Sequence, residues 1–385
     1  MSLSRRAFLA SVGAGSAGVM LRPIISARGA EALLALGRPE PGDPPAWSVP
    51  PASLVRIDSN ENPNGPGDRV FAAVRDSFGV ANRYPRGEER AALDAIAAAR
   101  GVKVENLMLG CGSTEILRVA TAAFAGPGRA LVQGSPTFEV MGRFAPTVNA
   151  PVRNVPVDAK LRLDLDAMAS AAKGAGVVYL CNPNNPTATV LGAAAVRQFV
   201  EQVAAASPAT VVLIDEAYHE YVDDPSYATA IPLALENPNV VVARTFSKVY
   251  GMAGLRLGYA IARPETLKRM RPWLLETNTN QPALAGATVT VADTGRIADE
   301  QRLNRSARAF TLDFFRNAGY ATSDSQANFV MVDIRRDVKT FKAECLKQGV
   351  SLGRPFPPLN THLRVSIGTM AEMQRAVEVI RGALA

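Results

Sequence analysis

The stretch Val240-Val241-Val242-Ala243-Arg244-Thr245-Phe246-Ser247-Lys248 joins a short apolar run to a polar segment that ends in a lysine. The first four residues show no polar alternation, which is typical of a strand buried on both faces of a sheet. Eight residues after the lysine comes Arg256, inside Gly254–Tyr259. The stretch therefore predicts a central strand whose end carries hydroxyl groups and cationic side chains.

Other short apolar runs have the same character. They are Leu107–Leu109, Ala130–Val132, Val177–Cys181, Val211–Ile214 and Leu257–Ile261. Helix-like segments lie between them, such as Glu88–Ala99, Thr114–Phe124 and Ala193–Ala206. Buried strands that alternate with helices predict an α/β fold with a mostly parallel, doubly wound sheet.

The pattern changes after about residue 275, where a long helical stretch leads into further strand and helix candidates. This change predicts a second, smaller α+β domain at the C-terminal end. The predicted regions are a signal region at 1–30, an N-terminal arm and linker at 31–69, a large domain at 70–274 and a small C-terminal domain at 275–385.

The composition is that of an ordinary globular protein, with 48% hydrophobic and 20% charged residues. Four arginines in the first thirty residues, where no acid occurs, account for four of the seven net positive charges. No basic run with interleaved aromatics is present, so we expect no nucleic-acid partner. Cys111, Cys181 and Cys345 have no metal-ligand spacing with either histidine, and we expect no metal site.

The N-terminal residues resemble a targeting signal. Ser4-Arg5-Arg6-Ala7-Phe8-Leu9 resembles the bacterial twin-arginine export signal. The run that follows, Ala10–Leu21, is too short and too rich in glycine to span a bilayer comfortably. We therefore expect export to the periplasm without stable membrane insertion, with the signal cleaved or retained; the cytoplasm is the alternative.

Four loops follow strands of the predicted sheet, and ligands of doubly wound sheets bind at the carboxyl ends of the strands. The first loop, Gly110–Glu115, precedes a helix, and its glycines allow close backbone approach to an anion at the helix N-terminus. Ser113 and Thr114 add hydroxyl donors. A simple capped turn with Ser113 as N-cap accounts for this loop equally well.

The second and third loops carry polar groups that suit an aromatic ring. In Asn182–Thr187 two prolines stiffen the backbone, so that an asparagine amide can donate to a ring oxygen; a tight turn is the alternative. Asp215 ends a buried strand and needs a cationic partner, which a protonated pyridine nitrogen would supply. The alternative for Asp215 is a cap on the next helix. Tyr218 lies within reach of the same ring.

The fourth loop contains the lysine of the opening stretch. Lys248 is suited to a Schiff base with an aldehyde cofactor, and Thr245, Ser247 and Arg256 would hold a phosphate together with the glycine loop. Each motif is modest alone, but their order along the chain predicts a pyridoxal 5'-phosphate site.

At these residues the chain resembles the fold-type I pyridoxal-phosphate aminotransferases, whose fold is aspartate-aminotransferase-like, and it most resembles the histidinol-phosphate aminotransferases among them. The resemblance runs from about residue 55 to residue 383. It is carried by Ser59–Pro66, Arg83–Pro85, Gly112–Glu115, Asn182–Thr187, Asp215–Tyr218, Thr245–Lys248 with Arg256, and Leu363–Thr369.

The resemblance implies a role for each matching residue. Lys248 would bind the cofactor covalently and shuttle a proton, Asp215 would pair with the ring nitrogen, and Asn185 and Tyr218 would bond the ring oxygen. Phe138 would stack on the ring. The phosphate would be held by Gly112, Ser113, Thr114, Thr245, Ser247 and Arg256.

The resemblance also implies substrate and subunit contacts. Arg364 would bind the substrate carboxylate, Arg354 its other end, and Asn62 would lie at the substrate. Tyr84 would reach the phosphate of a neighbouring subunit, which implies a homodimer with shared active sites.

We therefore predict an enzyme that moves an amino group between an amino acid, or a histidinol-phosphate-like amine, and a 2-oxo acid or phosphorylated ketone. Export would favour a substrate other than histidinol phosphate, because histidine biosynthesis is cytoplasmic. The alternatives are a decarboxylase of a phosphorylated amino acid, a carbon–sulfur lyase, and an exported binding protein without turnover.

Overall fold

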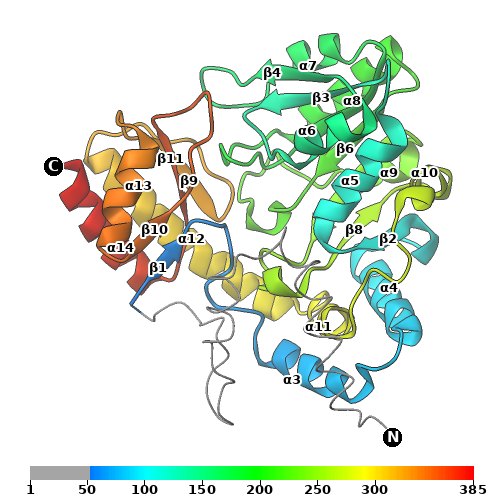
Figure 1. Cartoon of the computed structure of the whole chain (residues 1–385), viewed down its shortest axis with the longest axis horizontal. Helices are drawn as coiled ribbons and strands as arrows, with labels where there is room; N and C mark the ends of the chain where they lie inside the picture. Colours follow the sequence, from blue (N-terminus) through cyan, green and yellow to red (C-terminus); the bar gives the residue numbers. More distant parts are fainter. Residues whose placement is uncertain (1–52) are drawn as a thin grey trace, which may run out of the picture. The chain divides into compact units, whose positions relative to one another are not determined.

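The computed structural model describes residues 53–385. The predicted signal region at 1–30 and the first part of the predicted arm lie outside the described residues. The described chain contains a seven-stranded sheet of order β2-β8-β7-β6-β5-β3-β4 (Figure 1). Its strands are β2 (Leu107–Gly110), β3 (Ala130–Ser135), β4 (Val152–Pro156), β5 (Ala175–Cys181), β6 (Val211–Asp215), β7 (Val240–Thr245) and β8 (Gly258–Ile261).

The sheet is mostly parallel, as predicted. β4, β3, β5, β6 and β7 pair in parallel, whereas β8 is antiparallel to both of its neighbours, β7 and β2. Because β8 alone is reversed, the carboxyl ends of the other strands meet at one edge. The α/β class and the mostly parallel sheet are confirmed.

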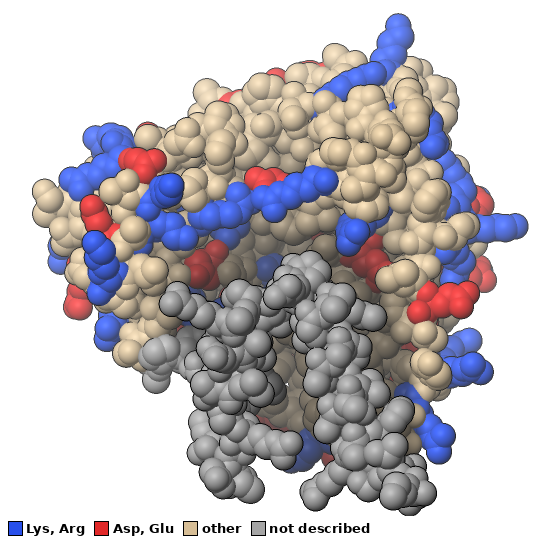
Figure 2. All heavy atoms as spheres, viewed as in Figure 1, with Lys and Arg blue, Asp and Glu red and all other residues tan. Residues whose placement is uncertain are grey.

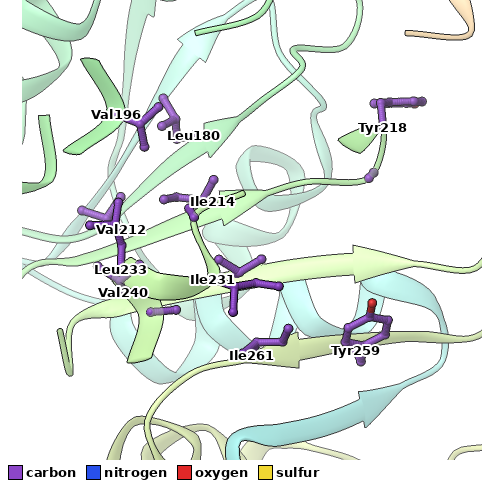
Figure 3. Close-up of a cluster of buried hydrophobic side chains, with 14 of the residues drawn as sticks. Leu180, Val196, Val212, Ile214, Tyr218, Ile231, Leu233, Val240, Tyr259 and Ile261 are labelled. Atoms are coloured by element: carbon purple, nitrogen blue, oxygen red, sulfur yellow. The ribbon is translucent and has the colours of Figure 1, made fainter. Parts of the chain in front are cut away.

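Side chains of successive strand residues enter two different cores, one on each face of the sheet. Val212 and Ile214 pack in one core, and Val211 and Leu213 in the other. Figure 3 shows part of the first core, where side chains of neighbouring strands meet Val196 and Leu233 from two helices. Burial on both faces explains why these strands contain so few polar residues.

Helices cover both faces of the sheet. The first core contains side chains from α3 (Asp68–Ser77), α4 (Arg86–Arg100), α7 (Leu165–Ala171), α8 (Ala193–Ala206), α9 (Ile231–Glu236) and α11 (Gln281–Thr290). The second contains side chains from α5 (Gly112–Phe124), α6 (Val140–Phe144) and α10 (Pro264–Met270).

A third core lies in the C-terminal part of the chain. It is built from α12 (Thr294–Asn317), β9 (Phe329–Asp333), α13 (Val338–Lys347), β10 (Val350–Leu352), β11 (His362–Ser366) and α14 (Met370–Leu384), together with β1 (Val55–Ile57). β1 pairs in parallel with β10, so the start of the described chain joins the C-terminal core (Figure 1). β11 pairs antiparallel with β9.

None of the helices within residues 53–385 combines the length and apolarity needed to cross a membrane.

Candidate active site

A cavity of about 630 Å³ lies at the carboxyl edge of the seven-stranded sheet. Strand ends β5, β6 and β7 reach it from one side, and the C-terminal part of the chain closes the other. The predicted site residues that line it are Ser113, Thr114, Phe138, Asn185, Asp215, Tyr218, Thr245, Ser247, Lys248, Arg256, Arg354 and Arg364. Residues more than 250 positions apart in the sequence thus share one cavity.

Lys248 lies in the loop between β7 and β8, with its ammonium group inside the cavity. Its Nζ donates to the main-chain oxygen of Asn60 at 3.0 Å and lies 5.5 Å from the ring centre of Tyr218. Burial, and next the nearby charge of Arg364, lower the pKa of Lys248 to about 8. Near neutral pH a larger fraction of this amine than of an ordinary lysine is therefore unprotonated and able to act as a nucleophile or a base.

Asp215 ends β6 and is almost completely buried. Tyr179 donates to Oδ2 at 2.8 Å, and the backbone N–H of Ala217 donates to Oδ1 at 3.1 Å. Burial raises the pKa of Asp215 to about 6, against the lowering effect of these two hydrogen bonds. Within residues 53–385 no cationic side chain forms an ion pair with this carboxylate. A buried carboxylate in this state is stabilised by a ligand that brings a positive charge.

The hydroxyl group of Tyr218 is held by two amides. Asn60 Nδ2 donates to it at 3.2 Å and Asn185 Nδ2 at 3.3 Å. Because both amides donate, the hydroxyl keeps its own hydrogen for an acceptor, and no such acceptor is present among the described residues. Burial raises the pKa of Tyr218, which keeps the phenol protonated. Tyr218 can therefore donate to an anionic oxygen in the cavity.

Backbone and guanidinium groups approach closely at the N-terminus of α5. Gly112 has a φ of 72°, and a Cβ built on it would lie 2.5 Å from Nη2 of Arg256. A Cβ on Gly258 would lie 2.2 Å from the backbone nitrogen of Ser113. Arg256 Nη1 donates to the oxygen of Ala253 at 2.8 Å. The two glycines are required so that the helix N-terminus and the guanidinium can lie together, which creates a site for an anion.

Two hydroxyl groups extend this site from the end of β7. Thr245 and Ser247 are buried, and their side-chain oxygens lie 2.9 Å apart. Arg256 Nη1 lies 3.4 Å from Ser247 Oγ. Hydroxyl groups, helix N–H groups and a guanidinium are the donors that a phosphate group accepts from.

Arg364 presents a buried cation on the opposite side of the cavity, from β11. Nη1 donates to Asn185 Oδ1 at 2.8 Å and Nη2 donates to the oxygen of Asp58 at 2.6 Å, while Nε is buried without a partner among the described residues. Burial lowers the pKa of Arg364 to about 10. No carboxylate of residues 53–385 forms an ion pair with it. An anionic ligand group would complete its coordination.

Three predicted site residues lie outside the cavity lining. Gly112 is next to it and contacts Arg256 as described. The side chain of Asn62 is buried, where Nδ2 donates to the oxygen of Val249 at 2.9 Å and Oδ1 accepts from the backbone of Asn64 at 2.9 Å. Tyr84 is 74% exposed, in the loop before α4.

The structure adds residues that the sequence analysis did not assign to the site. Asn60 accepts from Lys248, donates to Tyr218, and its Oδ1 accepts from Ser366 Oγ at 2.7 Å. Tyr179 supports Asp215 from within β5. A tyrosine in an otherwise aliphatic strand was a signal for a buried polar partner. The contacts of Asn60 join residues that are far apart in the sequence, so no local sequence pattern indicates them.

A buried ion pair that the sequence did not predict joins the ends of two strands. Glu216 follows Asp215, and Arg244 precedes Thr245. Arg244 Nε donates to Glu216 Oε2 at 3.0 Å, and both side chains are buried. The pair joins the end of β6 to the end of β7, so it positions Asp215 relative to the lysine loop.

Comparison with known proteins gives consistent matches. Residues 52–380 match the family model described as aminotransferase class I and II. The histidinol-phosphate aminotransferase of Symbiobacterium thermophilum is 37% identical over 334 residues, covering 86% of this chain and 91% of that protein. Histidinol-phosphate aminotransferase 2 of Pseudomonas fluorescens (strain Pf-5) is 36% identical over 344 residues, covering 88% and 90%.

A solved structure matches over a similar span. It is the crystal structure of histidinol-phosphate aminotransferase from Sinorhizobium meliloti in complex with pyridoxal-5'-phosphate. The TM-score is 0.77 at 27% sequence identity, and the match covers 85% of this chain and 91% of that chain. The fold is the aspartate-aminotransferase-like fold type I.

Proposed function

The chain belongs to the aminotransferase class I and II family, and we propose that its cavity binds substrates with an anionic group on the side of Arg364. The protein is a pyridoxal-phosphate-dependent aminotransferase, which moves an amino group from a donor to an oxo acceptor. The relatives favour this reaction over the decarboxylase, lyase and binding-protein alternatives.

The residues of the cavity fit the cofactor. The unpaired buried carboxylate of Asp215 suits a protonated ring nitrogen, and the free hydrogen of Tyr218 suits a ring oxygen, which Asn185 would also bond. Phe138 would stack on the ring. The phosphate would be held by Gly112, Ser113, Thr114, Thr245, Ser247 and Arg256. The single observation that carries the proposal is that Lys248, Asp215 and this anion site share one cavity.

Lys248 would transfer the protons in the transamination. Pyridoxal phosphate, when bound, supplies an electron-withdrawing ring that stabilises negative charge at the reacting carbon. Lys248 Nζ would take the proton from Cα of the donor and return a proton to the corresponding carbon of the acceptor. The pKa of about 8 suits this work, because both the protonated and the neutral amine are populated near neutral pH.

Two arginines support an anionic substrate. Arg364 would bind the substrate carboxylate, and Arg354, which lines the same cavity, would bind the other end of the substrate. The names of the relatives support a phosphorylated amine such as histidinol phosphate as one substrate, with an amino acid and a 2-oxo acid as the other pair. Asn62, two residues after Asn60, would contact the substrate.

A homodimer is part of the proposal. Tyr84 is exposed, as are Phe71, Phe78, Trp273 and Leu275. Subunit interfaces often bury large apolar side chains, and we propose that these residues contact the neighbouring subunit. In the homodimer Tyr84 would reach the phosphate site of the neighbouring subunit.

We also propose that the protein is exported and that it has two domains. The twin-arginine segment supports transport of the folded, cofactor-loaded protein to the periplasm, and an exported protein would use an anionic amine other than histidinol phosphate, because histidine biosynthesis is cytoplasmic. The separate C-terminal core supports a second, smaller domain, although β1 from the arm joins that core and α11, which lies after the proposed boundary at 274/275, packs in the first core.

Half-reaction spectroscopy tests the function. The purified protein, loaded with cofactor, is mixed with single amino donors while the absorbance of the bound cofactor is followed. A transaminase converts to the pyridoxamine form and stays there until a 2-oxo acid is added. A return to the starting spectrum without an acceptor would instead indicate a lyase or a decarboxylase.

A further inference from the structure

Arg354, one of the cations that line the cavity, forms an ion pair with a carboxylate of the protein itself. Glu139 follows Phe138, at the N-terminal end of α6. Its Oε2 lies 2.9 Å from Nη2 of Arg354, which comes from the loop after β10. The side chain of Arg354 is 43% exposed and that of Glu139 33% exposed. The pair therefore lies where an entering substrate can reach it.

Arg354 belongs to a group of cations on the wall formed by the C-terminal part of the chain. Arg354 and Arg364 lie over the same ring, that of Phe356, at 4.2 Å and 4.8 Å from its centre. Lys342, on α13, lines the cavity too. Figure 2 shows basic side chains along the border of a hollow on the face that it displays. Within residues 53–385, Glu139 is the one carboxylate that forms an ion pair with any of these three cations.

Glu139 keeps a second cationic partner when Arg354 binds another anion. Its Oε2 also accepts from Arg143, one turn further along α6. When an anion takes Arg354, the Glu139 carboxylate keeps this second cation and remains partly exposed to water. The exchange therefore leaves no charge buried and unpaired, which is the costly outcome.

We propose that Glu139 is an internal competitor for Arg354 that weakens the binding of an anionic group at the far end of the substrate. Any anion that takes Arg354 displaces the same carboxylate, and the tether gives Glu139 a high effective concentration. The competition therefore raises the dissociation constants of a carboxylate and of a phosphate monoester by a similar factor, and an anion must bind strongly, as phosphate can with its extra charge and three acceptor oxygens, to occupy Arg354 at low concentration. This inference extends the aminotransferase function proposed above and depends on it.

The test compares the cofactor-loaded wild type with Glu139→Gln. The dissociation constants of inorganic phosphate and of succinate are measured by calorimetry, which needs no turnover. The kcat/KM values for histidinol phosphate and for glutamate are measured in the half-reaction. Glu265→Gln, which removes an exposed carboxylate on α10, is the matched control.

In Glu139→Gln the dissociation constant of succinate is expected to fall by up to about five-fold, the range of an exposed ion pair. That of phosphate is expected to fall by a similar factor, because both anions displace the same carboxylate. The kcat/KM values of both amino donors are expected to rise accordingly. The control leaves the dissociation constants and the kcat/KM values unchanged.

The outcomes separate this inference from the function itself. Dissociation constants that Glu139→Gln leaves unchanged, or raises, overturn the role of Glu139. The expected fall in both constants, together with a wild type that converts neither donor, contradicts the proposed function and leaves the anion competition intact.

Discussion

The two sides of the cavity differ in how their side chains are held. On the sheet side, Asp215, Thr245 and Ser247 are short, buried residues at strand ends. On the C-terminal side, Lys342 and Arg354 have long side chains and are partly exposed, and of the three cations there only Arg364 is buried, in β11. Short buried groups hold their positions without a ligand, which suits a reaction centre. Long exposed groups adapt, which suits a choice among substrates.

The comparison predicts that the sheet side tolerates substitution least. Lys248→Ala removes the amine that binds the cofactor and moves the proton, and we expect kcat to fall by about 10⁴-fold or more. Lys268→Ala, an exposed lysine on α10, is the control and should leave kcat unchanged. Steady-state kinetics with saturating cofactor measures both. Activity of Lys248→Ala within tenfold of the wild type would remove the lysine from the reaction.

Asp215→Asn tests the carboxylate opposite the lysine. The amide keeps the size of the side chain but removes its charge, so a protonated ring nitrogen would lose its partner in a buried place. We expect kcat/KM to fall by about 10²- to 10³-fold, the usual effect of losing one member of a buried charge pair. Titration of the bound cofactor by absorbance would show whether its ring is less readily protonated. An unchanged titration would contradict the pairing.

The two arginines of the C-terminal side should differ from each other. Arg364→Gln removes a buried cation that makes two hydrogen bonds, and we expect kcat/KM for an amino acid donor to fall by about 10- to 100-fold. Arg354→Gln removes an exposed cation, and we expect a change of about five-fold or less. Equal losses in the two variants would show that burial is not what separates their roles.

Two glycines near the anion site form a matched pair. An alanine Cβ at Gly258 would lie 2.2 Å from the backbone of Ser113, whereas one at Gly254 would meet nothing within 4 Å. Gly258→Ala should lower the free energy of unfolding by about 1–3 kcal/mol, as overpacking does, and Gly254→Ala should have little effect. Urea unfolding of both variants provides the measurement. A Gly258→Ala protein as stable as the wild type would mean that the helix N-terminus can move away from β8.

The pH dependence of cofactor attachment tests the state of Lys248. The neutral amine is the nucleophile, and burial lowers its pKa to about 8, so deprotonation occurs at lower pH than for a free lysine. The rate of covalent attachment to the cofactor-free protein should therefore rise with pH and level off above about 8. Stopped-flow absorbance measures the rate. A rate that keeps rising to pH 10 would indicate an amine open to water.

Local sequence patterns predicted the sheet because its central strands are buried on both faces. β5, β6 and β7 were visible as aliphatic runs, and the polar residues just after them marked the site edge. β4 was not predicted, because it lies at the sheet edge and exposes Arg153 and Asn154. β1 and β10 are only three residues each, too short to give a periodic signal.

The residues that were not predicted depend on long-range contacts. Asn60 meets Lys248 across 188 positions, and Glu139 meets Arg354 between distant segments. No spacing rule relates such residues, since the fold alone brings them together. Their neighbours in sequence were recognised by family resemblance, whereas their contacts required the structure.

Chemical trapping identifies the lysine that binds the cofactor. Treating the cofactor-loaded protein with borohydride reduces a Schiff base to a stable bond, and peptide mass spectrometry then locates the modified lysine. We expect one modified peptide, with the cofactor on Lys248. A cofactor attached to another lysine, or no modified peptide from a protein that is active, would contradict it.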